Sequence, residues 1–125
     1  MKFKKILVLS LTMIMVMTTT VGVFAESTLI SASNGKHKFN KKWKSKVIEK
    51  RGKDGSRHYL AYGFDTFLIN EDYAYADSNG VRHRSKIINA RGAFRGPKKW
   101  ANQGRSDLEV WHKGSRVRYF CIRTN

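Results

Sequence analysis

The sequence predicts an all-β protein: a small antiparallel β-sandwich preceded by a signal peptide and a basic, partly disordered N-terminal arm. Three observations support this fold class. From residue 59 onward, short runs of aromatic and β-branched residues are typical of strands. Turn sequences separate these runs every ten residues or so, and no stretch after residue 58 keeps a helical period over three turns. We therefore expect a leader over 1–25, the arm over 26–58 and the sandwich over 59–125.

The first segment has the features of a signal peptide. Lys2, Lys4 and Lys5 give it a positive start, residues 6–23 are almost wholly apolar or small, and Ala25 ends it as signal peptidase requires. The alternative is a membrane anchor, because the apolar run approaches the roughly 20 residues that cross a bilayer. We favour cleavage after Ala25, and therefore expect a secreted, extracellular protein without a stable membrane span.

The second segment, residues 26–58, is strongly basic and poor in large apolar side chains. It holds ten basic and three acidic residues. Phe39, Trp43 and Val47 would share one face of a helix, yet the apolar residues beside Val47 would equally suit a short edge strand. We expect a mobile basic arm with one ordered stretch over 43–50.

Turn sequences divide the third segment into strands. Residues 59–69 form the first expected strand, in which Gly63 marks a bulge or a close approach of another backbone. The Asn-Gly pair within 77–80 is typical of two-residue hairpin turns, so we expect strands 73–76 and 81–89 to form a hairpin. Later turns, at 89–92, 96–97 and 113–114, delimit further strands at 108–112 and 116–123.

Basic residues open two of these strands. Alternation puts His83 and Ile87 on one face of strand 81–89 and the cations of that strand on the other. We expect His83 to have a structural role. Since both strands begin with cations and end apolar, we predict a cationic patch at one end of the sandwich. Guanidinium groups bind phosphate oxygens in pairs, so we predict a phosphate or pyrophosphate site made of Arg82, Arg84, Lys86, Arg116 and Arg118.

Cysteine and histidine usage limits the chemistry. Cys121 is the only cysteine, so no intramolecular disulfide forms. Its aromatic and aliphatic neighbours favour burial, and the alternative is pairing with a second chain. The four histidines are far apart in sequence and have no metal-ligand spacing. We therefore expect no metal and no cofactor.

The charge indicates an anionic partner. Without the three leader lysines, 22 basic residues remain against nine acidic residues. This excess is larger than the net charge of about 2–8 that solubility needs, and it attracts polyanions. An exported protein meets envelope polymers, anionic lipids and phosphorylated wall precursors. We therefore expect an anionic cell-envelope component of target bacteria as partner, and do not expect nucleic acid to be the main one.

Residues 59–122 resemble the lactococcin 972 family of secreted bacteriocins. The resemblance lies in a leader without a double glycine, a single small domain without disulfides, and an ordered set of short motifs. The motifs are Tyr62-Gly63, the tyrosines Tyr73 and Tyr75, the stretch HRSKIIN over 83–89, a strand after Gly104 and the closing Tyr119-Phe120. The chain departs from the family in its longer basic arm, in Cys121 and in Gly104-Arg105, where a glycine-tryptophan pair is typical.

This resemblance implies a β-sandwich toxin that blocks wall or septum assembly in Gram-positive cells by binding a wall precursor. It also implies an immunity protein or export transporter as a further partner, and it implies a binder, not an enzyme. One alternative is a non-toxic secreted module that binds envelope polyanions. Another is a small secreted ribonuclease, for which Glu109 and His112 supply the residue types, but these lie on opposite faces of the expected strand.

Overall fold

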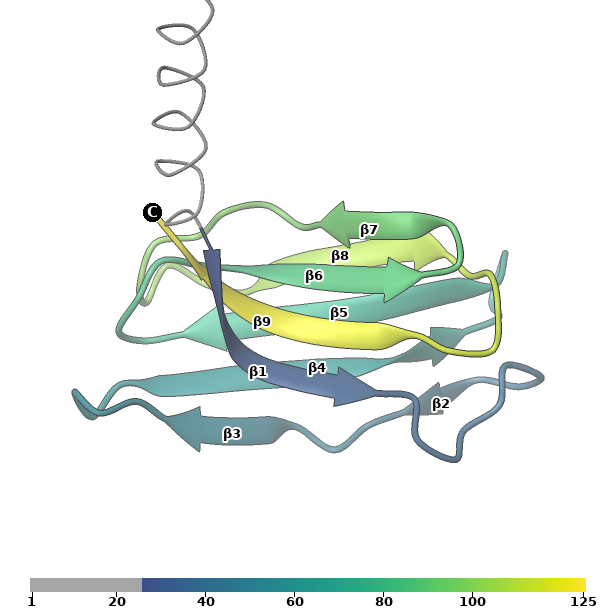
Figure 1. The fold of residues 1–125 in the computed structure, drawn as a ribbon, viewed down its shortest axis with the longest axis horizontal. Coiled ribbons are helices and arrows are strands. Elements are labelled where there is room, and N and C mark those ends of the chain that lie inside the picture. Colours follow the sequence, from purple (N-terminus) through teal and green to yellow (C-terminus); the bar gives the residue numbers. More distant parts are fainter. Residues whose placement is uncertain (1–25) are drawn as a thin grey trace, which may run out of the picture.

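The computed structural model describes residues 26–125, which form two antiparallel sheets stacked face to face (Figure 1). The predicted all-β sandwich is confirmed. The strand axes of one sheet are nearly aligned with those of the other. None of these residues is helical, and this part of the chain therefore has no helix that could span a membrane. The leader expected over 1–25 lies outside the described residues.

The front sheet in Figure 1 has four strands, and the rear sheet has five. In order across the front sheet these are β1 (Glu26–Ser33), β9 (Arg118–Thr124), β6 (His83–Asn89) and β7 (Gly92–Arg95). The order across the rear sheet is β2 (Trp43–Lys44), β4 (Arg57–Asp65), β5 (Glu71–Ser78) and β8 (Ser106–Trp111), with β3 (Ile48–Arg51) also paired to β4.

The segment 26–58 differs from the mobile arm that we expected. Its first eight residues form β1, which pairs with β9 from Glu26↔Thr124 to Ser33↔Arg118. Two further strands, β2 and β3, pair with β4 and extend the rear sheet. The serine-rich sequence of β1 resembles a linker because this edge strand buries only Ile30 fully, and its stability comes from the ladder to β9.

The Asn-Gly turn is not a hairpin. β5 belongs to the rear sheet and β6 to the front sheet, so residues 79–82 cross from one sheet to the other. Neither Asn79 nor Gly80 has the positive φ that a type I′ turn requires. Gly80 serves close packing instead, because a Cβ atom there would lie 2.2 Å from the Cβ of Ser56. The turn at 89–92 does form a hairpin, which joins β6 to β7.

The core lies between the sheets and is built by alternation along the strands. Leu60, Ile87, Val117 and Tyr119 have essentially no exposed surface. Fully burying an aliphatic side chain of this size contributes roughly 1.5–3 kcal/mol. Cys121 is also fully buried within this cluster, as its neighbours indicated, and burial raises the pKa of its thiol to about 12. The fold is therefore held by packing and strand pairing.

Gly63 shows the close approach that its position in the strand suggested. A Cβ atom at residue 63 would lie 2.4 Å from the hydroxyl of Tyr73 and 2.5 Å from the carbonyl oxygen of Trp43. Both neighbours belong to strands that pair with β4 at this point. Glycine is therefore required for the rear sheet to hold Trp43 and Tyr73 on either side.

Candidate functional site

The outer surface of the front sheet carries a group of four basic side chains, Arg84, Lys86, Arg95 and Arg118, which we call the cationic face. Strand register brings them together. Lys86 of β6 lies opposite Arg95 of β7 and opposite Phe120 of β9. One pair further along, Ile88 of β6 lies opposite Arg118. Since strands lie about 4.8 Å apart and alternate residues about 6.6 Å apart, the backbone positions of these cations form a grid with those spacings.

Phe120 supports two of these cations. Its ring is nearly buried on the outer surface of β9, with 5% exposed. The Lys86 Nζ lies 5.5 Å from the ring centroid, and the Arg118 Cζ lies 5.0 Å from it. The charged ends of both side chains therefore lie over the ring, in the geometry of a cation–π contact. The aromatic ring thus contacts two cations without neutralising them, of which Arg118 is exposed and Lys86 is half-buried.

Among residues 26–125, Glu26 is the one carboxylate that forms an ion pair with a member of the cationic face. This residue lies at the start of the edge strand β1, and its Oε2 accepts a hydrogen bond of 3.0 Å from Nη2 of Arg95 on the opposite edge strand β7. The hydrogen bond from Arg95 lowers the pKa of Glu26, and the charges of Arg95, Lys86 and Arg84 lower it further, against the effect of burial. Four cations against one carboxylate leave a net positive field that favours an anion.

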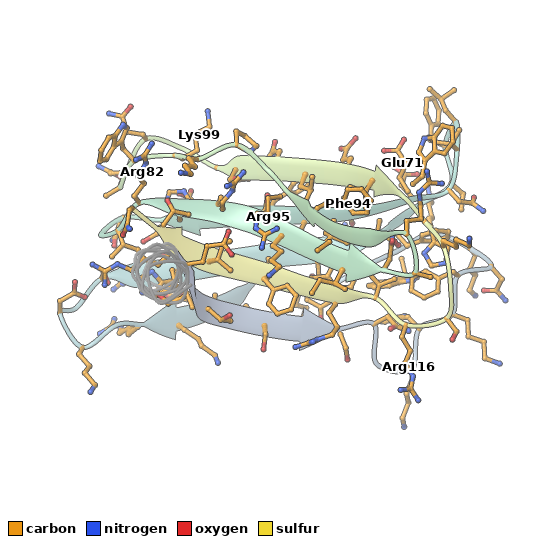
Figure 2. The ribbon with its side chains drawn as sticks, turned by 45° about the horizontal axis from the view of Figure 1, so that its top comes forward. Glu71, Arg82, Phe94, Arg95, Lys99 and Arg116 are labelled. Atoms are coloured by element: carbon orange, nitrogen blue, oxygen red, sulfur yellow. The ribbon has the colours of Figure 1, made fainter. Side chains whose placement is uncertain are left out.

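The five residues predicted as one patch separate into three places. β6 and β9 run antiparallel, so their basic beginnings lie at opposite ends of the sheet, and the predicted position of the patch at one end is wrong. Arg84, Lys86 and Arg118 still share the outer surface, but Figure 2 shows Arg82 and Arg116 at opposite ends of the sandwich.

Arg82 is engaged in local contacts. Its Cζ lies 4.2 Å from the ring centroid of Trp100, and its Nη1 donates a hydrogen bond of 2.6 Å to the carbonyl oxygen of Asn125. Arg116 precedes β9 in the exposed loop 112–117. Neither residue therefore belongs to the cationic face.

Arg95 is the member of the cationic face that the sequence did not reveal. It lies near the middle of this surface in Figure 2. The short strand Gly92-Ala93-Phe94-Arg95 follows the turn at 89–92, and a hairpin there places Arg95 opposite Lys86. The turn at 89–92 was therefore recognisable in the sequence. Arg95 comes to lie beside the other cations only because β6 and β7 pair across that turn in this register.

His83 faces the interior, as alternation along β6 indicated. Its side chain has no exposed surface. Nδ1 lies 2.9 Å from the carbonyl oxygen of Val81, and Nε2 lies 2.9 Å from that of Gly104. A neutral imidazole has a single N–H and donates to one of these oxygens at a time. His83 therefore links two loops at the end of the sandwich and does not open onto the cationic face.

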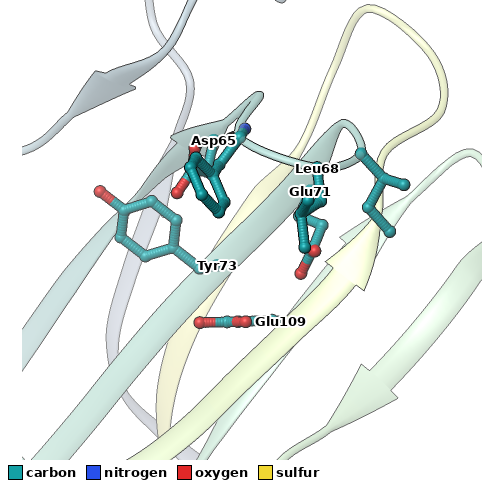
Figure 3. A pocket seen from close by; sticks show the side chains of 7 residues that line it. Asp65, Leu68, Glu71, Tyr73 and Glu109 are labelled. Atoms are coloured by element: carbon teal, nitrogen blue, oxygen red, sulfur yellow. Dashed lines mark hydrogen bonds between the residues drawn. The ribbon is translucent and has the colours of Figure 1, made fainter.

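The rear sheet carries a different surface, with a cavity of about 190 Å³ beside three carboxylates (Figure 3). Asp65, Glu71 and Glu109 line it together with Tyr73. Burial and the neighbouring Glu109 both raise the pKa of Glu71. The cavity has the wrong charge for phosphate. It lies beside the exposed apolar side chains of the turn between β4 and β5.

Glu109 and His112, the residues that a ribonuclease would use, do not meet at one site. Glu109 points outward from β8 and accepts a hydrogen bond of 3.0 Å from the hydroxyl of Tyr75. His112 lies 2.9 Å from Oδ1 of the fully buried Asp72. Asn89 donates a further hydrogen bond of 3.0 Å to Asp72. This buried network contributes to packing between the sheets.

Within residues 26–125, no three histidine, cysteine, aspartate or glutamate side chains are grouped so as to hold a metal ion. No protein-family model matches the chain, and no curated protein or solved structure matches it either.

Proposed function

We propose that this chain is an exported cationic antibacterial protein that binds an anionic component of the cell envelope through the cationic face. The observation that supports it is the grid of Arg84, Lys86, Arg95 and Arg118, balanced by Glu26 alone. This surface is a sheet face with cations in rows, a shape that suits an extended polymer or a pyrophosphate-linked precursor at a membrane. Arginine binds two phosphate oxygens at once, which adds geometric specificity to the charge.

The resemblance to the lactococcin 972 family supports the antibacterial part of the proposal, and it favours a phosphorylated wall precursor as the target. A non-toxic module that binds wall polyanions would use the same surface. The two differ in their effect on cells. We therefore pair a binding assay with a growth assay on Gram-positive strains.

The first experiment removes two positive charges from the cationic face in one variant. In a second variant it removes two positive charges from a different surface. The double variant Lys86→Gln/Arg118→Gln loses the two cations over Phe120, and neither has an acidic partner whose charge would be left unpaired. The matched control Lys50→Gln/Lys53→Gln loses the same charge from exposed positions in β3 and the loop after it. We expect at least about tenfold weaker binding to polyphosphate and to purified cell walls for the first variant only. Equal losses in both variants would show that total charge, and no particular surface, governs binding.

Salt dependence gives a second measure of the same site. On single-stranded nucleic acid, each neutralised phosphate contributes a slope of about −0.7 to log affinity against log salt. With four contacts, a fourfold rise in salt should weaken binding about 50-fold. With the two contacts left in Lys86→Gln/Arg118→Gln, the same rise should weaken it only about sevenfold. Binding that does not change with salt would refute an electrostatic site.

Growth inhibition then separates the toxin from the module. A toxin acting through this surface should inhibit growth of sensitive cells as the wild type and as the Lys50→Gln/Lys53→Gln control. It should lose potency in parallel with binding in the Lys86→Gln/Arg118→Gln variant. Binding without any inhibition across related Gram-positive strains would favour the non-toxic module.

A further inference from the structure

The turn between β4 and β5 exposes three large apolar side chains in succession, Phe67, Leu68 and Ile69, which we call the apolar tip. Phe67 is 85% exposed, Leu68 is 84% exposed and Ile69 is 40% exposed. Polar and glycine residues normally suffice for a turn of this length. Contiguous exposed apolar residues in a chain otherwise rich in lysine and arginine mark an interaction surface.

Other loops meet the apolar tip at the same end of the sandwich. The backbone N–H of His112 donates a hydrogen bond of 2.8 Å to the carbonyl oxygen of Asn70, which joins loop 112–117 to the turn. Loop 112–117 in turn contacts loop 34–42, because the N–H of Val117 donates to Oδ1 of Asn34 at 3.1 Å. It also contacts the turn after β6, through the hydrogen bond from Ala90 N to Lys113 O.

These neighbouring loops are strongly basic. Their exposed cations are Lys36, Lys38, Lys41, Lys42, Arg91, Lys113 and Arg116. The Arg91 Cζ lies 5.1 Å from the ring centroid of Trp111, and this tryptophan is 57% exposed. In Figure 2, Glu71, next to the turn, and Arg116 lie at this end, while Arg82 and Lys99 lie at the other. This end of the sandwich therefore carries the apolar tip, an exposed tryptophan and the cations of three loops.

The carboxylates near the apolar tip do not cancel this charge. Asp65, Glu71 and Glu109 lie on the strands of the rear sheet, beside the cavity of about 190 Å³ (Figure 3). Phe67 and Leu68 line this same cavity, yet more than four-fifths of each side chain is exposed to solvent. Three carboxylates on the sheet oppose seven cations on the loops.

We propose that this end of the sandwich docks on an anionic lipid bilayer, with the apolar tip inserted among the headgroups and the surrounding cations bound to phosphates. Apolar side chains in the interfacial region and lysines or arginines near anionic lipid each add to membrane affinity. Tryptophan favours the same depth. A projecting tip with cations spread over three loops suits a planar surface. The proposal uses different residues from the cationic face, so either proposal can fail alone.

A local probe tests this docking in the full chain. Leu68→Cys carries an environment-sensitive NBD label at the apolar tip, because the native Cys121 is fully buried and does not react in the folded protein. The matched control is Lys53→Cys, labelled in the exposed loop at the other end. The vesicles contain phosphatidylcholine alone or phosphatidylcholine with phosphatidylglycerol.

We expect a blue shift of the label at residue 68 with the anionic vesicles only, and quenching of that label by lipid-borne spin probes. The label at residue 53 should stay in water. A label at residue 68 that stays in water while the chain binds vesicles would overturn the proposal, since any anchoring would then come from another part of the chain. A blue shift at both positions would overturn it as well.

A second variant tests how much the apolar side chains contribute to membrane affinity, and whether a second copy of the chain binds the tip instead. Phe67→Ser/Leu68→Ser should weaken partitioning onto anionic vesicles by at least about tenfold, because both side chains are exposed in the folded protein and leave water only on the membrane. Trp100→Ser, which alters a 63% exposed apolar residue at the other end, should leave partitioning unchanged. If light scattering without vesicles finds a dimer that Phe67→Ser/Leu68→Ser dissociates, the tip pairs two copies of the chain and the bilayer proposal is wrong.

Discussion

His83→Ala should destabilise the protein strongly, although the residue lies between two surface arginines in sequence. The side chain has no exposed surface and lies 2.9 Å from the carbonyl oxygens of Val81 and Gly104. Alanine would leave one of these part-buried oxygens without its donor, at about 1–3 kcal/mol, and would leave a cavity the size of the ring. A loss of about 3 kcal/mol corresponds to a fall in the melting midpoint of roughly 12–24 °C for a domain of this size.

The assay is thermal unfolding followed by circular dichroism, together with binding of polyphosphate by the folded variant at low temperature. His83→Ala should bind normally while folded. Its neighbour Arg84→Ala should do the reverse, with weaker binding and a loss of only about 1 kcal/mol from the hydrogen bond of Arg84 Nε to the carbonyl of Gly96. A melting midpoint of His83→Ala within a few degrees of the wild type would refute the reasoning. So would a stable variant that no longer binds.

Three further predictions concern buried and titratable groups. Asp72→Ala should cost roughly 2–5 kcal/mol in urea unfolding, because Nδ1 of His112 and Nδ2 of Asn89 both lose this carboxylate partner; an unchanged urea midpoint would contradict this. Glu71→Gln should stabilise the protein by up to about 1 kcal/mol at pH 7. The raised pKa of Glu71 means that the folded state holds this proton more tightly than the unfolded state, so its contribution to stability is full below about pH 4.5 and is lost as pH rises through the folded pKa. The gain from glutamine should therefore vanish in melts at pH 4 and persist at pH 7. Cys121 should resist thiol reagents in the folded protein and react at once in guanidinium, because burial raises its pKa to about 12; rapid labelling of the native chain would show that the strand opens.

Local patterns predicted the strands better than they predicted the neighbours of each strand. Alternation along β6 correctly placed His83 inside and Arg84 outside, because a side-chain period of two follows from strand geometry alone. The Asn-Gly pair at 79–80 wrongly predicted a hairpin. The packing of β5 and β6 in separate sheets overrides the preference of this dipeptide for a two-residue hairpin turn. Sequence alone carries no signal for that choice, which depends on burial by strands distant in the chain.

The dependence on strands distant in the chain also explains why the candidate site could be predicted only in part. Arg84, Lys86 and Arg118 share the outer surface because β6 and β9 are neighbours, but their antiparallel direction separates Arg82 from Arg116. Direction and order within a sheet are non-local properties. The serine-rich start of the segment 26–58 was misread for a related reason, since its strand character depends on a partner at the other end of the sequence.

The pairing of β1 with β9 also has a consequence for when the protein can fold. The first described strand and the last one lie side by side, and β9 occupies the interior of the front sheet between β1 and β6. While β9 is still inside the ribosome, β1 has no strand to pair with. The edge of β6 that later adjoins β9 is also unpaired. Contacts between strands so distant in sequence form slowly. The conformational entropy of the long segment between them is lost before the hydrogen bonds between the strands compensate for it. Completion of the front sheet is thereby postponed until β9 has been synthesised.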